Sequence, residues 1–192
     1  MVKTASTMLP LGTEAPDFSL PDTISGTTLS RNDIAEGKPL LMMFICAHCP
    51  FVIHVEDQLA KLGNNYKGRL GIAAVSANSV QTHPADAPEK LKEQAEKCGF
   101  SFPYLYDATQ EVAQAYTAAC TPDFFLFDDQ HKLVYRGQLD ASRPGSDVPV
   151  DGSDLRAAVE ACLSGTDVPD PQLPSIGCNI KWHPGSEPSY FG

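Results

Sequence analysis

The chain has 192 residues, 42% of them hydrophobic, so it is long enough to bury a sizeable core as one domain with an attached tail. Its formal net charge is −10 and no run of Lys or Arg offsets it, which argues against binding to nucleic acid or to an anionic membrane surface. The longest apolar stretch, residues 40–46, is far shorter than the roughly 20 residues that span a bilayer, and residues 1–10 lack the continuous apolar run of a signal peptide. We therefore expect a cytoplasmic protein with neither nucleic acid nor membrane as a partner.

The first half of the chain predicts a small hairpin followed by a β-α-β unit. Its expected elements are a hairpin over residues 15–30, a strand over 40–45, a helix over 50–65 and a strand over 70–75. Residues 40–45 are apolar without interruption, which is typical of a strand buried on both faces of a central sheet. From Pro50 the apolar residues follow a helical period instead.

The second half adds helices and an antiparallel hairpin. Its expected elements are a polar loop over 76–88, a helix ending at Gly99, a short helix over 111–119, strands over 124–127 and 133–136, and a helix starting at about residue 153. Together these elements predict an α/β fold with a mixed sheet and helices on both faces. Beyond Gly165 prolines accumulate and periodicity is lost, so we expect a domain over 1–165 and a Pro-rich tail over 166–192 that packs on the domain or trails from it.

The most informative motif is Cys46-Ala47-His48-Cys49-Pro50, at the end of the buried strand and the start of the helix. Two thiols at this spacing indicate a redox pair. The unpaired N–H groups and dipole at a helix N-terminus favour thiolate over thiol, and only the thiolate attacks disulfides. We expect Cys46 to be the more exposed thiol and the nucleophile, and Cys49 to resolve the mixed disulfide.

A second motif lies far downstream, where Thr121-Pro122 precedes the predicted hairpin. CxxC at a strand-to-helix junction followed by Thr-Pro before a hairpin resembles the thioredoxin superfamily, in which that proline is cis and lies beside the CxxC. A longer pattern resembles the peroxiredoxin-like, AhpC/TSA-type redoxins. It comprises Ala15-Pro16-Asp17-Phe18, residues 44–50, 102–107 and 121–128, and the tail segment 174–182.

This resemblance implies a thioredoxin-like fold with an N-terminal hairpin extension and a thiol-disulfide oxidoreductase that needs no cofactor. Thr121 and Pro122 would form the wall that faces the substrate. His48 holds the place of the His in the Cys-Pro-His-Cys motif of DsbA-type proteins, so it would stabilise the Cys46 thiolate and make the pair more oxidising than thioredoxin. Protein or small-molecule disulfides and thiols are the expected partners, with a thioredoxin- or glutathione-type reductant.

Departures from both relatives leave alternatives open. Peroxiredoxins have a Thr three residues before the peroxidatic Cys and an Arg near the proline; here these places hold Cys46 and Thr121-Pro122. The alternative enzyme is an antioxidant thiol peroxidase in which Cys49 is peroxidatic and Cys46 resolving. Thioredoxin's buried carboxylate corresponds to Leu40, so the Cys49 proton would leave through water, His48 or another acid such as Glu56 or Asp57.

The other cysteines and histidines add a third alternative. Cys98 and Cys162 fit apolar helical stripes and are expected in the core. Cys120, two residues before Pro122, and Cys178 in the tail are candidate auxiliary thiols; the simplest expectation is core packing for Cys120 and partial exposure for Cys178. A metal-binding or redox-sensing module would combine Cys46 and Cys49 with His48 or the otherwise solvated His54, but no second CxxC or His pair completes four ligands.

Overall fold

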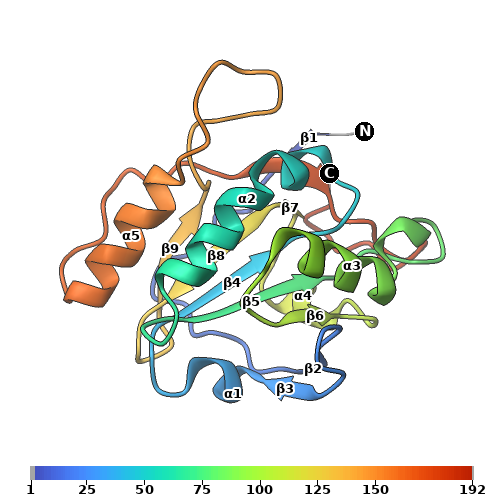
Figure 1. Ribbon diagram of the computed structural model, residues 1–192, viewed down its shortest axis with the longest axis horizontal. Helices are drawn as coiled ribbons and strands as arrows, with labels where there is room; N and C mark the ends of the chain where they lie inside the picture. The colour runs from blue at the N-terminus through green and yellow to red at the C-terminus, as the bar shows by residue number, and fades with distance from the viewer. Residues whose placement is uncertain (1–2, 192) are drawn as a thin grey trace.

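The computed structural model describes residues 3–191, and a five-stranded mixed sheet forms its centre (Figure 1). In spatial order the strands are β6 (Tyr104–Tyr106), β5 (Gly71–Ser76), β4 (Leu40–Phe44), β8 (Asp123–Phe127) and β9 (Leu133–Gly137). Strand β4 pairs in parallel with β5 and antiparallel with β8, while β6 is parallel to β5 and β9 antiparallel to β8. This is the thioredoxin-like α/β fold that the resemblance predicted.

Helices cover both faces of this sheet. One face carries α2 (Pro50–Asn65), α3 (Pro88–Cys98) and α5 (Ser153–Ser164). The other carries α1 (Arg31–Ala35), α4 (Glu111–Ala115) and the hairpin of β2 (Ser19–Pro21) and β3 (Thr28–Ser30). Side chains of β4 alternate between the two cores, with Leu41 and Met43 on one face and Met42 and Phe44 on the other. Burial on both faces explains the uninterrupted apolar run.

A separate three-stranded sheet joins the two ends of the chain. It consists of β1 (Lys3–Ala5), β10 (Ile176–Asn179) and β7 (Cys120–Thr121), with β10 in the middle and both pairings antiparallel. The segment 166–192 thus contributes a strand that its Pro-rich composition did not indicate. This strand places the C-terminal segment directly beside the Thr121-Pro122 motif.

Gly177 permits the close approach of β10 to β7. A Cβ atom at this position would collide with the carbonyl group of Thr121. We expect Gly177→Ala to lower the free energy of unfolding by about 1–3 kcal/mol, because the clash is with backbone that cannot rotate away. Urea unfolding of both proteins measures the change. Asn179→Ala, in the same strand, is the matched control; an equal loss in both variants would contradict the steric explanation.

Several predicted elements differ in detail. The helix predicted over 111–119 ends at Ala115, and Thr117 takes a left-handed conformation with φ of 50°. The short elements α1, β1, β6 and β7 and the one-turn 3-10 helix η1 (Pro84–Asp86) had no sequence prediction. Each has two to five residues, too few for a hydrophobic period to be recognised. Within residues 3–191 no helix is both long and apolar enough to cross a membrane.

Candidate active site

Strand β4 and helix α2 position the two thiols of the CxxC motif. The strand ends at Phe44, and the Ile45 amide still donates to the Val75 carbonyl of β5 at 3.0 Å. Cys49 is the N-cap residue of α2, in extended conformation with φ −72° and ψ 123°, and Pro50 occupies the first turn of the helix. Proline fits there because its missing N–H leaves no hydrogen bond unmade. The motif therefore lies at the carboxyl end of the central strand, as its sequence predicts.

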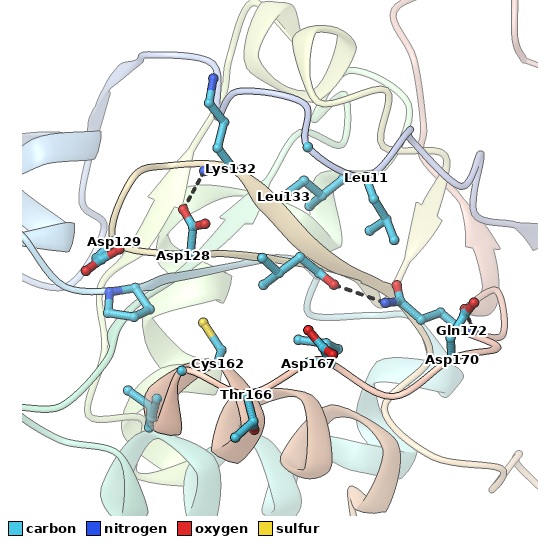
Figure 2. A pocket seen from close by; sticks show the side chains of 16 residues that line it. Leu11, Asp128, Asp129, Lys132, Leu133, Cys162, Thr166, Asp167, Asp170 and Gln172 are labelled. Carbon is cyan, nitrogen blue, oxygen red and sulfur yellow. Dashed lines mark hydrogen bonds between the residues drawn. The ribbon is translucent and has the colours of Figure 1, made fainter.

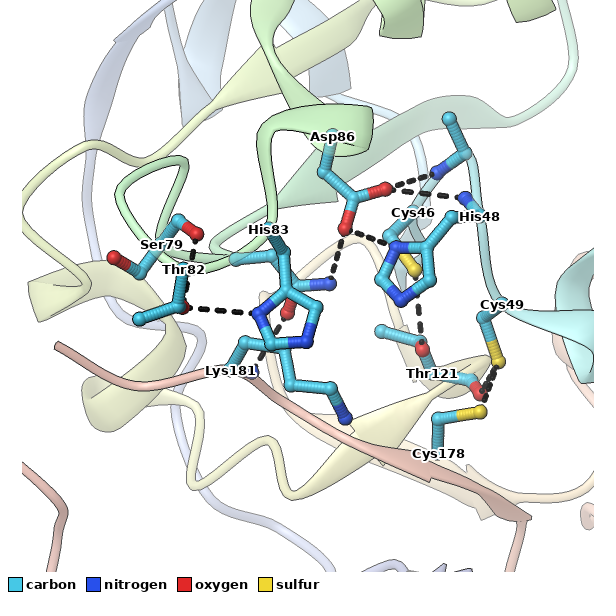
Figure 3. Close-up of polar contacts among 12 residues, drawn as sticks. Cys46, His48, Cys49, Ser79, Thr82, His83, Asp86, Thr121, Cys178 and Lys181 are labelled. Atoms are coloured by element: carbon cyan, nitrogen blue, oxygen red, sulfur yellow. Dashed lines mark hydrogen bonds and ion pairs between the residues drawn. The ribbon is translucent and has the colours of Figure 1, made fainter. Parts of the chain in front are cut away.

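Cys49 lies against Thr121 and Cys178, and the Thr121 carbonyl oxygen can accept a hydrogen bond from the protonated thiol of Cys49 (Figure 3). Its Sγ lies 3.2 Å from the Thr121 carbonyl oxygen and 2.7 Å from the Cys178 Sγ. The pKa of Cys49 is lowered to about 5, above all by the hydrogen bond from the Cys46 thiol, with further contributions from Cys178, Thr121 and the Val52 amide that outweigh burial. Cys49 is thus a thiolate at neutral pH.

Cys46 has the opposite electrostatic environment. Its side chain is 1% exposed, and its Sγ lies 3.5 Å from the Thr121 Oγ1. Its pKa is raised by the hydrogen bond to Cys49, by burial and by the negative charge of Asp86. The sequence predicts the thiolate on Cys46 as the more exposed thiol, but both side chains are buried, Cys46 at 1% and Cys49 at 0% exposed. The hydrogen bond between the two thiols raises the pKa of Cys46 and lowers that of Cys49, which favours Cys49 as the thiolate.

A buried carboxylate, Asp86, organises the loop between the two cysteines. Its Oδ1 accepts hydrogen bonds from the amides of Ala47 at 2.9 Å and His48 at 3.1 Å. Its Oδ2 accepts from Asn78 Nδ2 at 2.7 Å and lies 2.5 Å from His48 Nδ1. Burial disfavours ionisation, but the bonds from His48 and Asn78 keep the pKa of Asp86 below its usual value. Asp86 thus supplies a buried negative charge beside the CxxC.

His48 forms an ion pair with this carboxylate and faces a second histidine. The hydrogen bond to Asp86 raises the pKa of His48 despite partial burial, and the charge of Cys49 contributes in the same direction. The imidazole stacks on that of His83, with ring centroids 5.3 Å apart at an interplanar angle of 22° (Figure 3). The bond to Asp86 and the contact with His83 thus fix the position of the imidazole, and the raised pKa favours its protonated form.

Replacing Asp86 tests this arrangement. We expect Asp86→Asn to lower the free energy of unfolding by about 2–4 kcal/mol, because several buried hydrogen bonds lose their charged acceptor. The pKa of His48 should fall toward its ordinary value, which NMR titration of the imidazole measures. Asp57→Asn, on the exposed side of α2, is the control. An unchanged His48 pKa in Asp86→Asn would show that the ion pair does not form.

Sequence reasoning missed Asp86, Asn78 and His83 because all three lie in the loop over residues 76–88, which was interpreted only as polar. The topology provides a signal for their position. Strands β4 and β5 are parallel neighbours, so the segments that follow their carboxyl ends meet at one edge of the sheet. Of the acids suggested instead, Glu56 pairs with Lys97 at 3.0 Å and Asp57 is exposed, so neither lies at the thiols.

Thr121 and Pro122 form one wall of the site. The peptide bond between them is cis, as the resemblance implied. Thr121 is buried and meets both thiols, through its hydroxyl toward Cys46 and its carbonyl toward Cys49. The structure thus brings together Cys46, His48, Cys49, Thr121 and Pro122, the five residues selected from the sequence.

The two candidate auxiliary thiols lie in different surroundings. Cys178 is 2% exposed and contacts Cys49, so the expectation of partial exposure is wrong. Cys178 reaches the site because it lies on strand β10 and pairs there with Thr121 of β7. Cys120 is fully buried, and its Sγ lies 3.5 Å from the Pro122 carbonyl oxygen. Cys178 joins the thiol pair, whereas Cys120 bonds to backbone.

The remaining candidates lie away from the thiols. His54 is half-buried and its Nε2 lies 3.2 Å from the Ser142 Oγ. Cys98 and Cys162 are half-buried rather than part of the closed core. Cys162 lines an open pocket of about 920 Å³ at the other end of β4, between α5 and the β8–β9 turn (Figure 2). The residues that line this pocket include none of the CxxC motif.

One group of the described residues has the donor set for a metal ion. The donor atoms of Cys46, His48 and Asp86 all lie within 4.8 Å of one another. This group keeps Cys46 and His48 of the metal hypothesis drawn from the sequence, with Asp86 in place of Cys49. The Nδ1 of His48 already bonds to Asp86, so a metal would have to bind in competition with this ion pair.

A thiol pair beside a cis-proline on a thioredoxin-like sheet places the protein among the thioredoxin-like redox proteins. The comparison with family models is more specific, because residues 11–136 match the AhpC/TSA family. The chain belongs to this family. Membership indicates a thiol-based redox function.

Solved structures match the fold over nearly the whole chain. An uncharacterized conserved protein from Geobacillus kaustophilus is 49% identical, with a TM-score of 0.94 over 97% of this chain and 99% of that one. A hypothetical protein from Sinorhizobium meliloti 1021 is 47% identical, with a TM-score of 0.92 over 95% of this chain and 100% of that one. The thioredoxin domain of a thiol-disulfide oxidoreductase from Bacteroides vulgatus is 25% identical, with a TM-score of 0.56 over 67% of this chain and 88% of that one. No curated protein matches the chain.

Proposed function

We propose that the protein is a thiol-disulfide oxidoreductase that cycles Cys46 and Cys49 between a dithiol and a disulfide. The observation that carries this proposal is the hydrogen-bonded pair of thiols at the N-terminus of α2, one of them a thiolate. Thiol-disulfide exchange needs a thiolate to attack and a second thiol within reach to complete the protein disulfide. Cys49 and Cys46 supply these two groups.

The low pKa of Cys49 supports a first attack by this residue. Its thiolate attacks a disulfide of the partner, forms a mixed disulfide and releases one partner thiolate. Cys46 then attacks the Cys49 sulfur, the bond to the partner breaks, and the second partner thiolate leaves as the Cys46–Cys49 disulfide forms. Two electrons pass from the protein to the partner, and the proton of Cys46 goes to solvent. This order reverses the roles expected from the sequence.

The other residues of the site tune and shape this chemistry. The positive charge of His48, held by Asp86, favours the Cys49 thiolate. Thr121 and Pro122 form the wall against which a partner disulfide would lie. Suitable partners are protein or small-molecule disulfides and thiols, with a thioredoxin- or glutathione-type reductant. A cytoplasmic location remains a prediction.

A second candidate function is a thiol peroxidase with Cys49 as the peroxidatic residue. The low pKa of Cys49 at a helix N-cap favours it, because peroxide also reacts with a thiolate. The groups that orient peroxide in peroxiredoxins argue against it. Cys46 stands in place of the usual Thr, and the two arginines at and after the end of the predicted hairpin strand bond to backbone, since Arg136 donates to the Leu9 carbonyl and Arg143 to the Asp140 carbonyl, both at 2.9 Å.

Titration of the dithiol against glutathione tests the proposal. We expect a reversible two-electron transition with a midpoint above thioredoxin's roughly −270 mV, because a stabilised thiolate favours the reduced form. The transition should disappear in Cys49→Ser and persist in Cys98→Ser, which removes a thiol outside the site. Rapid oxidation by peroxide together with slow reaction with disulfides would favour the peroxidase instead. A midpoint at or below the thioredoxin value would contradict the predicted effect of the thiolate.

A further inference from the structure

A third thiol reaches the active site from the C-terminal segment. Strand β10 pairs with β1 and β7 at once, and in this register Cys178 lies opposite both Lys3 and Thr121. Its side chain is 2% exposed and points at Cys49 in Figure 3. The tail thus delivers a buried thiol to one sulfur of the CxxC pair.

The contact between these sulfurs is close to bonding distance. The Sγ atoms of Cys49 and Cys178 are 2.7 Å apart, whereas a disulfide bond measures about 2.05 Å. Both cysteines contact the same residue, Thr121. Its carbonyl oxygen lies 3.2 Å from the Cys49 Sγ, and its backbone pairs with that of Cys178 between strands β7 and β10. A shift of well under 1 Å would therefore join the two sulfur atoms.

We propose that Cys178 is a second resolving thiol, so that the site works as a three-thiol relay in which Cys49 bonds in turn to the partner, to Cys178 and to Cys46. This inference rests on the proposed function and names a further residue of the same reaction. The substrate of the relay is any disulfide that forms a mixed disulfide with Cys49.

Each step of the relay conserves electrons. In the mixed disulfide, the Cys178 sulfur attacks the Cys49 sulfur, the Cys49–partner bond breaks, and the partner leaves as a thiolate while the Cys178 proton goes to solvent. Cys46 then attacks the Cys49 sulfur of the Cys49–Cys178 disulfide. That exchange forms Cys46–Cys49 and returns Cys178 to a thiol without further oxidation.

The electrostatics of the resting site suit a thiol that waits for this step. The pKa of Cys178 is raised to about 12 by burial, and then by its hydrogen bond to Cys49 and the charge of Cys49. The last two causes vanish when Cys49 enters a mixed disulfide, because its sulfur is then neutral. The charge of Lys181 and the Phe51 amide, which favour the Cys178 thiolate, remain. Capture of a partner by Cys49 thus lowers the pKa of Cys178, while burial, the largest cause of its raised value, persists.

Cys46→Ser isolates the second resolving thiol. After addition of oxidised glutathione to this variant, we expect the Cys49–glutathione adduct to decay into a Cys49–Cys178 disulfide, identified by mass spectrometry of peptides from a non-reducing digest. The double variant Cys46→Ser/Cys178→Ser should retain the adduct for at least about tenfold longer, since an adjacent thiol reacts intramolecularly. Cys46→Ser/Cys98→Ser is the matched control and should behave like Cys46→Ser.

The wild-type protein gives an independent measurement. Acid quenching during the glutathione titration should trap a fraction with the Cys49–Cys178 linkage beside Cys46–Cys49. Two results together would overturn the relay: equal adduct lifetimes in Cys46→Ser and Cys46→Ser/Cys178→Ser, and no Cys49–Cys178 disulfide in either Cys46→Ser or the wild type. Failure of the proposed function looks different, because then the wild type would form no Cys46–Cys49 disulfide with glutathione.

Discussion

Cys49→Ser is expected to lower the rate constant for reaction with a disulfide by at least about 10³-fold, because a serine hydroxyl is not ionised at neutral pH and cannot replace a thiolate. Cys46→Ser should keep the first step within about tenfold, since the serine hydroxyl can still donate to Cys49. Rapid mixing of each reduced protein with oxidised glutathione, followed by mass spectrometry of the adduct, measures the rate constants.

The comparison of the two variants decides which thiol attacks. A nucleophilic Cys46, the assignment expected from the sequence, would reverse the result, with Cys46→Ser inactive in the first step and Cys49→Ser forming an adduct on Cys46. Cys162→Ser serves as the control for loss of a thiol, because this residue lines the pocket at the far end of β4.

The second large effect is a pH dependence of stability that exists only in the reduced protein. The pKa of Cys49 is about 5 in the folded protein, against an ordinary value of about 8.5 in an unfolded chain. The unfolded state therefore binds more protons between these values, so the Cys49 contribution is complete above about pH 8.5 and is lost as the pH falls toward 5. Its slope is at most about 1.4 kcal/mol per pH unit.

The titration of His48 changes the free energy of unfolding in the opposite direction, so its contribution must be separated from that of Cys49. The folded pKa of His48 is raised, so its contribution is complete below its unfolded pKa of about 6.5 and is lost as the pH rises through the folded value. The difference in free energy of unfolding between reduced wild type and Cys49→Ser, measured in urea from pH 5 to 8, removes the part of the His48 contribution that comes from Asp86 and leaves the part that comes from the Cys49 charge. We expect this difference to grow with pH, and a flat difference would contradict the thiolate at Cys49.

The sequence was sufficient for the central fold because its elements are long and strongly patterned. The apolar run of β4 and the helical period of α2 each predict one structure and one place in the sheet. The CxxC and Thr-Pro motifs could likewise be placed together through the family resemblance. These local patterns located five residues of the site.

The rest of the site depends on contacts between segments that are distant in sequence. Asp86 lies in a loop without periodicity, and only the parallel pairing of β4 and β5 brings it under the CxxC. The choice of Cys49 as thiolate depends on its contacts with Cys46, Cys178 and Thr121, which no local sequence pattern shows. Cys178 lies on a four-residue strand whose two partner strands are both more than 50 residues away in the sequence.

The pairing of β10 between β1 and β7 also has a consequence for biosynthesis. A ribosome makes the chain from the N-terminus, so the CxxC motif emerges long before Cys178 and the strand that carries it. Until residues up to Asn179 have been added, β1 has no partner in this small sheet and the Thr121 wall has an open edge. The nascent chain therefore carries Cys46 and Cys49 without the third thiol, and the complete redox centre forms only after the chain through β10 has been translated.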